Sequence, residues 1–106
     1  MSGWLLDGES SWGGRPVVRT VADLQPRSRA VLSGRVRVVR VRMGPRFEVE
    51  LDDGTGVVVL RWLGRDAIPG MEVGAEIVAE GTVLVERDRP LLLNPLYRFA
   101  HSSTSW

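Results

Sequence analysis

Arginine is the residue type of this chain with the most specific chemistry to offer. All fourteen basic residues are arginine and none is lysine. A guanidinium group presents a planar fork to phosphate and a flat face to a nucleobase, which a lysine ammonium group does not. Codon usage in a GC-rich genome explains the bias, but its consequence is a set of side chains suited to anions. The net charge of +1 is too small to indicate a nucleic-acid ligand by itself.

Residues suited to catalysis are scarce. The absence of cysteine excludes disulfides, thiolate metal sites and a cysteine nucleophile. The single histidine, His101, lies in a polar stretch with no nearby partner. Asp52 and Asp53 are adjacent, but neighbouring strand and turn residues point apart, and turn geometry explains Asp53 before Gly54. No phosphate loop, nucleophile elbow or Cys/His metal spacing is present, so we expect no enzymatic activity, no metal and no cofactor.

The length of 106 residues fits one domain, and 43% hydrophobic with 25% charged residues is a globular composition. The sequence has no signal-peptide pattern and no apolar run of about 20 residues, so we expect a cytoplasmic protein without membrane contact. We expect a flexible N-terminal tail over 1–15, a folded domain over 16–100 and a C-terminal tail over 101–106.

Five β-strands are expected between the tails. They cover 30–43, 46–52, 56–63, 75–86 and 90–94, and turn signals rich in glycine and proline separate them. A short helical turn over 20–24, capped by Thr20 and ended by Pro26, precedes the first strand. The regular spacing of short strands favours an all-β barrel or sandwich over alternating strands and helices.

The first strand carries an irregularity that favours a closed barrel. Val36 and Val38 alternate with arginines, but the phase then slips by one residue, so Val39 and Val41 continue the apolar series. A β-bulge near Val38 and Val39 restores the apolar face, and Gly34 offers a second bending point. A long, bent first strand shared between two edges is what a five-stranded barrel requires.

Several short motifs resemble a known family in their order and spacing. They are Gly34-Arg-Val36, Leu51-Asp-Asp-Gly-Thr-Gly56, Arg61-Trp62, Pro69-Gly70 with Gly74, Glu80-Gly-Thr-Val83 and Leu93-Asn-Pro-Leu-Tyr97. Over 17–99 the chain resembles oligonucleotide/oligosaccharide-binding (OB) domains, of the type found as the DNA-binding wedge of bacterial branch-migration helicases. More distantly, it is similar to the anticodon-binding OB domains of some tRNA synthetases. The resemblance implies an all-β, five-stranded Greek-key barrel that binds nucleic acid. It implies no enzymatic role, since no helicase motor is present, and some OB domains bind only proteins.

The strongest hairpin signal is Asp53-Gly54, and it determines which residues face the barrel interior. As a two-residue turn it places Phe47 opposite Leu60, and residues two apart along each strand share that face. The expected interior residues are Val36, Val39, Val41, Phe47, Val49, Val58, Leu60, Trp62, Ile77, Val83 and Leu93.

The outer face of the same hairpins carries arginines. The two-residue turn places Arg46 opposite Arg61. For the first hairpin, a three-residue tip over 43–45 sets Arg42 against Arg46, whereas a five-residue tip pairs Arg42 with Glu48. In the first register three arginines form a row across three strands. Opposed like charges destabilise a sheet, so a row of arginines is better explained if it contacts phosphates.

The candidate nucleic-acid-binding residues extend beyond this row. Arg40 lies beside it, Arg87 and Arg89 close the other side of a groove, and Tyr97 offers a stacking platform. The complete set is Arg40, Arg42, Arg46, Arg61, Arg87, Arg89 and Tyr97. Charges of alternating sign, as around Arg87, are also typical of a solvated turn.

Two functions follow from these observations. The first is binding of single-stranded or branched DNA or RNA with little sequence specificity. The alternative is a protein-interaction module that keeps the barrel without a nucleic-acid ligand. The arginine row favours the first, whereas Glu48 and Glu50 on the same face and the near-neutral charge favour the second. The sequence leaves the roles of Trp4, Trp12 and Trp106 in the tails open.

Overall fold

The computed structural model describes residues 17–100. Both expected tails, with Trp4, Trp12, His101 and Trp106, lie outside the described residues. The elements are β1 (Val17–Val18), the 3-10 helix η2 (Val21–Asp23), β2 (Arg29–Arg42), β3 (Arg46–Asp52), β4 (Val57–Leu63), β5 (Glu76–Glu86), β6 (Arg89–Leu93) and β7 (Leu96–Phe99). All five expected strands are present with ends within one residue of the expected positions, and the short strands β1 and β7 were not predicted.

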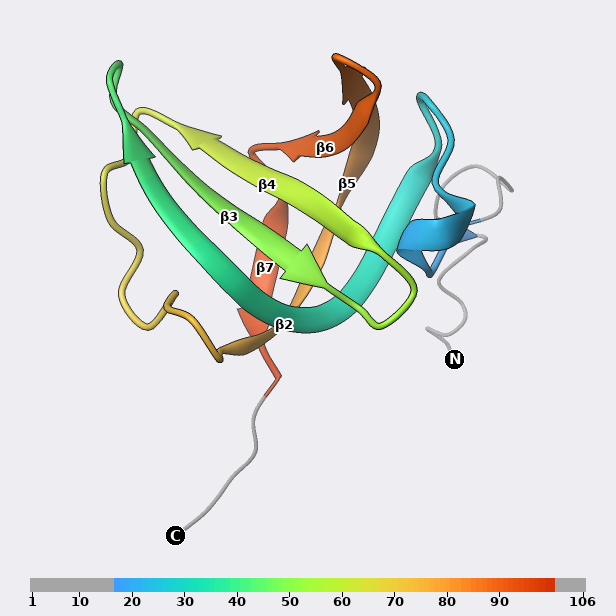
Figure 1. Cartoon of the computed structure of the whole chain (residues 1–106), viewed down its shortest axis with the longest axis horizontal. Coiled ribbons are helices and arrows are strands. Elements are labelled where there is room, and N and C mark those ends of the chain that lie inside the picture. Colours follow the sequence, from blue (N-terminus) through green and yellow to red (C-terminus); the bar gives the residue numbers. More distant parts are fainter. Residues whose placement is uncertain (1–16, 101–106) are drawn as a thin grey trace, which may run out of the picture.

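Five strands form a closed ring (Figure 1) in the order β2, β3, β4, β6 and β5, because β2 pairs with both β3 and β5. Neighbours in the ring are antiparallel except β4 and β6, which run parallel. This arrangement is the five-stranded OB barrel expected from the sequence. β1 adds to the ring beside the start of β2, and β7 adds to it beside β5. No helix within 17–100 has the length and apolar character needed to cross a membrane.

Strand β2 closes the barrel because its two halves pair with different strands. The half up to Arg35 pairs with β5, and the half from Arg35 onward pairs with β3. The pairing with β3 shifts just after Val36, so the bulge centres on Arg37, slightly before its expected position. A Cβ atom on Gly34 would lie 2.6 Å from the carbonyl oxygen of Asp52, so glycine is needed where the two halves meet.

The hairpin between β3 and β4 differs from the two-residue turn expected at Asp53-Gly54. Phe47 lies opposite Trp62 rather than Leu60, and four residues, 53–56, form the connection. The Asp53 carboxylate stabilises this longer loop, since it accepts hydrogen bonds from two N–H groups inside the loop at 2.8 and 3.2 Å. The shift of two residues keeps the expected side chains inside the barrel, because strand faces alternate with a period of two.

The same carboxylate caps the 3-10 helix η2. Its Oδ2 accepts a hydrogen bond from the N–H of Val21 at 2.8 Å, and the hydroxyl of Thr55 accepts one from the N–H of Ala22 at 3.0 Å. The expected cap, Thr20, instead donates its hydroxyl to the carboxylate of Asp23 at 2.7 Å. Burial would raise the pKa of the capping carboxyl group, but hydrogen bonds from Thr55 and the backbone outweigh burial and lower that pKa.

The core fills the barrel interior as expected at most positions. Its buried members include Val36, Phe47, Val49, Val58, Leu60, Trp62, Ile77, Val83 and Leu92, and Val39 packs against them. Two expected interior residues are exposed: Val41 (57%), near the end of β2, and Leu93 (38%), at the end of β6. In β6 it is Leu92 that faces inward, because a two-residue turn at 87–88 pairs it with Val83.

The two hairpin tips and the ends of the described chain lie at different parts of the barrel. In Figure 1 the β2–β3 and β5–β6 tips project on one side. Val17 pairs with Arg29 at the beginning of β2, and the N–H of Ala100 donates to the carbonyl of Glu76 at the beginning of β5. The C-terminal end is therefore attached at the end of β5 opposite to the β5–β6 tip, whereas the N-terminal end lies beside the start of β2, which pairs with Thr82 in the last third of β5.

Phe47 provides a test of the barrel packing. It is buried, and its ring centroid lies 6.1 Å from that of Trp62. Phe47→Ala should lower the free energy of unfolding by about 3–5 kcal/mol, because it leaves a cavity. Urea denaturation followed by tryptophan fluorescence measures this loss. Met43→Ala, at an exposed tip position, is the control and should change stability by less than about 0.5 kcal/mol. Equal effects of the two variants would contradict the assigned interior.

Candidate nucleic-acid interface

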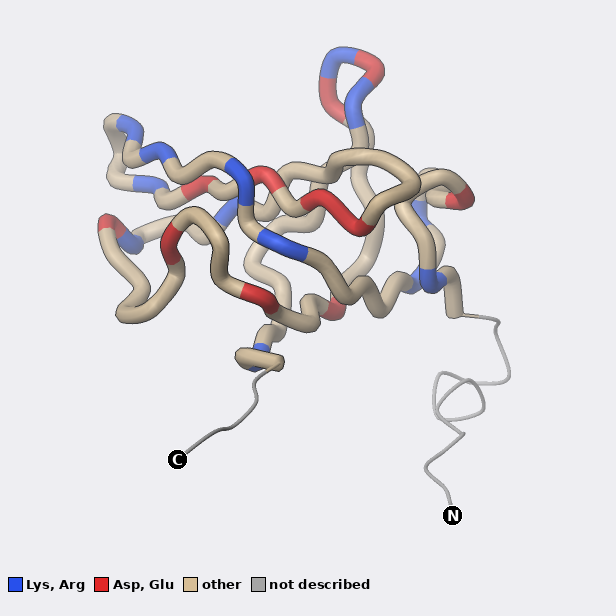
Figure 2. Tube along the Cα trace, turned by 60° about the horizontal axis from the view of Figure 1, so that its bottom comes forward, with Lys and Arg blue, Asp and Glu red and all other residues tan. Residues whose placement is uncertain are grey.

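A groove of about 480 Å³ crosses the outer face of the barrel between the two hairpins. Its lining residues are Arg40, Arg42, Arg46, Glu48, Glu50, Val59, Arg61, Glu86, Arg87, Arg89, Pro90 and Leu91. Six of the seven predicted site residues are among them, and they come from β2, β3, β4 and the β5–β6 hairpin. Figure 2 shows positive and negative residues interspersed along these segments. Six arginines and three glutamates give the lining a net charge of +3.

The expected row of three arginines is not formed. Arg42 lies opposite Arg46, as the three-residue hairpin tip predicts, but Arg61 lies opposite Glu48. The longer β3–β4 loop causes this difference, because it moves β4 by two residues relative to β3. The shift replaces a like-charge pair by a pair of opposite charges, which stabilises the sheet instead of destabilising it.

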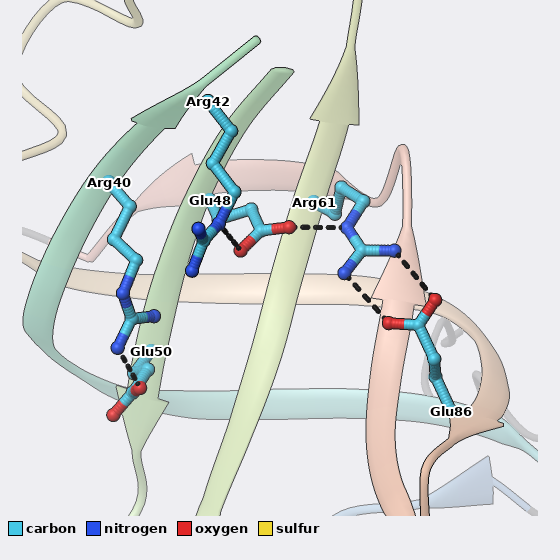
Figure 3. Close-up of polar contacts among 6 residues, drawn as sticks. All are labelled: Arg40, Arg42, Glu48, Glu50, Arg61 and Glu86. Carbon is cyan, nitrogen blue, oxygen red and sulfur yellow. Dashed lines mark hydrogen bonds and ion pairs between the residues drawn. The ribbon is translucent and has the colours of Figure 1, made fainter. Parts of the chain in front are cut away.

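Glu48 lies at the centre of an ion-pair network beneath the groove (Figure 3). Its side chain is only 5% exposed, and its carboxylate accepts hydrogen bonds from Nε of Arg42 at 3.2 Å and Nε of Arg61 at 2.6 Å. Burial would raise the pKa of Glu48, but the hydrogen bonds and charges of Arg61 and Arg42 outweigh burial and lower that pKa. The ionised carboxylate therefore holds two arginines in place.

Glu50 repeats this arrangement further along β3. Its Oε2 accepts a hydrogen bond from Nη2 of Arg40 at 2.8 Å, and its Oε1 lies 3.4 Å from Nε of Arg37. Strand β3 is thus buried on both faces, with apolar side chains inside the barrel and two glutamates outside. Buried carboxylates need partners, so the arginines of β2 and β4 are required for the packing of β3 as well as for the charge of the groove.

Arg61 has a second acidic partner, Glu86, which the sequence analysis did not assign to the site. Nη1 and Nη2 of Arg61 lie 3.3 and 2.9 Å from the two carboxylate oxygens of Glu86. The hydrogen bond from Arg61 lowers the pKa of Glu86, and Glu86 raises the pKa of Arg61. The two residues are 25 positions apart, and the parallel pairing of β4 with β6 brings them together. The sequence held no signal for this contact, since alternating charge at a turn usually indicates solvent exposure.

Three other arginines of the groove form no ion pair. Arg46, Arg87 and Arg89 make no side-chain hydrogen bond or ion pair with any residue in the described part of the chain. Nε of Arg46 is buried and lacks a hydrogen-bond partner. Arg87 and Asp88 both have positive φ and form the tip of the β5–β6 hairpin. These three guanidinium groups are the cations of the groove that remain available to an anion.

Tyr97 does not line the groove, and its role as a stacking platform stays a prediction. Its ring contacts those of Trp62 and Phe99 edge to face, with centroids 5.6 and 5.9 Å apart. It packs against the core beside Trp62, whose indole N–H donates to the carbonyl of Pro95 at 3.0 Å. Its position in β7, paired with β5, was invisible from the sequence because β7 was not predicted. Among residues 17–100, none of those that line the groove is aromatic.

The sequence matches no protein-family model and no curated protein, but solved structures share its fold. A replication protein A heterotrimer bound to ssDNA is similar with a TM-score of 0.60 and 16% identity, covering 76% of this chain and 63% of that one. RecG bound to a three-way DNA junction has a TM-score of 0.64 and 20% identity, covering 78% and 12%. A putative aspartyl-tRNA synthetase from Leishmania major Friedlin has a TM-score of 0.63 and 15% identity, covering 84% and 21%. The chain spans less than two thirds of each of these proteins, and the likeness confirms the OB fold.

Glu48→Gln tests the ionic role of the buried network. Because the pKa of Glu48 is lower in the folded chain, its ionised form stabilises the fold above its ordinary pKa of 4.5, and this stabilisation is lost as the pH falls through the folded-state pKa. We expect Glu48→Gln to lower the free energy of unfolding by about 1–3 kcal/mol at neutral pH. The variant and the wild type should converge in acid, which urea denaturation at a series of pH values measures.

Glu76→Gln is the matched control for this experiment. It breaks an exposed ion pair with Arg35 and should change the free energy of unfolding little at any pH. A loss of stability in Glu48→Gln that stays the same from neutral pH to acid would contradict the ionic role of Glu48.

Proposed function

We propose that this chain is a nucleic-acid-binding module whose ligand is single-stranded or branched DNA or RNA. The observation that carries the proposal is the group of Arg46, Arg87 and Arg89, which line a positively charged groove and form no ion pair or hydrogen bond through their side chains within the described residues. A guanidinium fork matches the oxygens of a phosphate group, and contacts to phosphates carry no base information. Binding with little sequence specificity follows. The proposal assigns the chain no catalytic role.

The shape of the groove supports a single strand as the ligand. The groove lies on β3 and β4 between the two hairpins, which is the surface that OB folds use for oligonucleotides. Val59, Pro90 and Leu91 add an apolar part to the lining, against which unpaired bases pack. Bases in a duplex are stacked inside the helix and do not reach such a surface. The lack of an aromatic platform in the described groove predicts modest affinity, since stacking on aromatic side chains adds about 1–3 kcal/mol per base.

The similar structures support the same class of ligand. Replication protein A was solved with ssDNA and RecG with a three-way DNA junction. At 16% and 20% identity they share the fold with this chain, and the activities of those whole proteins are not transferred. Their ligands make single-stranded and branched DNA the first substrates to test.

A protein-interaction module is the second candidate function. The observation that favours it is the internal neutralisation of Arg40, Arg42 and Arg61 by glutamates, which leaves only half of the arginines in the groove for a ligand. In this case an acidic segment of a partner protein would contact the three remaining arginines. The replication protein A neighbour is itself a heterotrimer, so a protein partner is compatible with the fold.

Replacing Arg46, Arg87 and Arg89 together by Gln tests whether the groove is the nucleic-acid-binding site. If each contacts one phosphate, the slope of log affinity against log salt concentration should flatten by about two units, since each contact with a single strand contributes about −0.7. Affinity should fall for every sequence tested. Fluorescence anisotropy of labelled single-stranded, forked and duplex DNA, and of single-stranded RNA, at several salt concentrations measures both quantities.

A second triple variant keeps the overall charge equal. Arg35, Arg65 and Arg98 lie outside the groove, and their joint replacement by Gln removes the same charge. This control should keep the wild-type salt slope. Equal flattening in both variants would show attraction by total charge and refute the groove as the site. Failure of the wild-type chain to bind any of the nucleic acids at low salt would favour the protein-interaction function.

A further inference from the structure

The guanidinium group of Arg61 is bound by two carboxylates, each at a different edge. Its Nε donates to Glu48 at 2.6 Å, and its two Nη atoms donate to Glu86 at 2.9 and 3.3 Å (Figure 3). The Nη edge is the one that presents two parallel donors, and this geometry binds carboxylates and phosphates alike. Arg61 lines the groove, so this edge lies at the proposed binding surface.

The two carboxylates differ in how easily a competing anion displaces them from Arg61. Glu48 is 5% exposed and shared with Arg42, so moving it would leave buried charges without partners. Glu86 is 54% exposed, and Arg61 is its only hydrogen-bond partner among the described residues. Glu86 is also the last residue of β5, directly before the two-residue tip of the hairpin. Exposed ion pairs contribute little to stability, so the Arg61–Glu86 contact is the one that a competing anion opens.

We propose that the Nη edge of Arg61 is a phosphate-binding position, which Glu86 occupies in the free chain and leaves when a phosphodiester binds. This inference rests on the proposed function and adds a fourth arginine to the three that form no ion pair. Glu48 keeps Arg61 oriented throughout, because it binds the opposite edge of the same guanidinium group. Glu86 is therefore an internal competitor of the ligand.

The charges around Glu86 fit a phosphate in the same place. Arg46 and Arg87 both act on Glu86 electrostatically, in addition to its contact with Arg61. Three positive charges thus act on one carboxylate, and Arg61 is the one in direct contact with it. A phosphodiester carries the same single negative charge and offers oxygens to all three. Without Glu86, the net charge of the remaining lining is +4 instead of +3, which favours an anion at this position.

Glu86→Gln tests the competition, with Asp88→Asn as the matched control. Both variants remove one negative charge from the same hairpin, but Asp88 has no contact with Arg61. Asn tolerates the positive φ of Asp88, so the hairpin tip is kept. Anisotropy titrations of a labelled single-stranded oligonucleotide with the full-length chain should show roughly two- to fivefold tighter binding for Glu86→Gln, the range set by an exposed ion pair. Asp88→Asn should stay close to the wild type.

A second measurement follows Glu86 directly in the wild-type chain. The carboxyl carbon signal of Glu86, followed by NMR through a pH titration, reports its pKa. We expect this pKa to rise when a saturating oligonucleotide is added, because Glu86 loses Arg61 and gains a phosphate nearby.

Each outcome decides the inference. Tighter binding of Glu86→Gln alone, together with the rise in the Glu86 pKa, supports it. Binding by the wild type with equal gains in Glu86→Gln and Asp88→Asn, or with an unchanged Glu86 pKa, overturns the inference and leaves the proposed function standing. Absence of binding by the wild type and all variants overturns both. Binding by Glu86→Gln but not by the wild type or Asp88→Asn supports the inference in its strongest form.

Discussion

Two buried carboxylates on the outer face of β3 form ion pairs with arginines, and the rest of the site depends on these ion pairs. Glu48 and Glu50 lie beneath arginines from β2 and β4, so β3 is covered on both faces. Removing one member of a buried ion pair leaves an uncompensated charge, which costs more than the pair contributes. The arginines of the groove therefore fall into two groups. Arg42 and Arg61 mainly stabilise the fold, whereas Arg87 and Arg89 can contact a ligand without a loss of stability.

The bulge in β2 determines which side chains of that strand lie on the outer face of the barrel with Glu48 and Glu50. The extra residue at Arg37 changes the phase of the strand, so that Arg40 and Arg42 point outward while Val39 remains against the core. Without the bulge, strict alternation along β2 would turn either the two arginines inward or Val39 outward. The same irregularity bends β2 so that its two halves reach both β3 and β5. Barrel closure and the arginines of the groove thus have a common local cause.

The sequence predicted the parts of the fold that rest on local patterns. Alternation and turn residues located five strands, and the phase slip in β2 located a bulge within about two residues. The prediction failed where a distant contact decides the geometry. Asp53 forms a four-residue loop partly because it caps Val21, 32 positions away, and this loop length sets which residue faces Arg61. Three consecutive leucines in β6 show no alternation, so the sequence alone did not reveal that Leu92 faces inward.

The candidate site was predicted in composition but not in pairing. Six of seven expected residues line one groove, because hairpin geometry brings outward arginines together whichever register holds. Which of these arginines are neutralised could not be predicted, since this depends on which glutamate each guanidinium group contacts. The Arg61–Glu86 contact needs β4 beside β6, a neighbour relation that belongs to the barrel as a whole.

The positions of the chain ends have a practical meaning for a module of this kind. Ala100 is attached at the beginning of β5, whereas the groove includes the residues at the opposite end of that strand. A bead, a sensor surface or a covalently joined second domain attached through the C-terminal side would thus lie at the far end of β5 from a ligand bound in the groove. The barrel is therefore suited to attachment through its C-terminal side, because this end and the groove lie at opposite ends of β5.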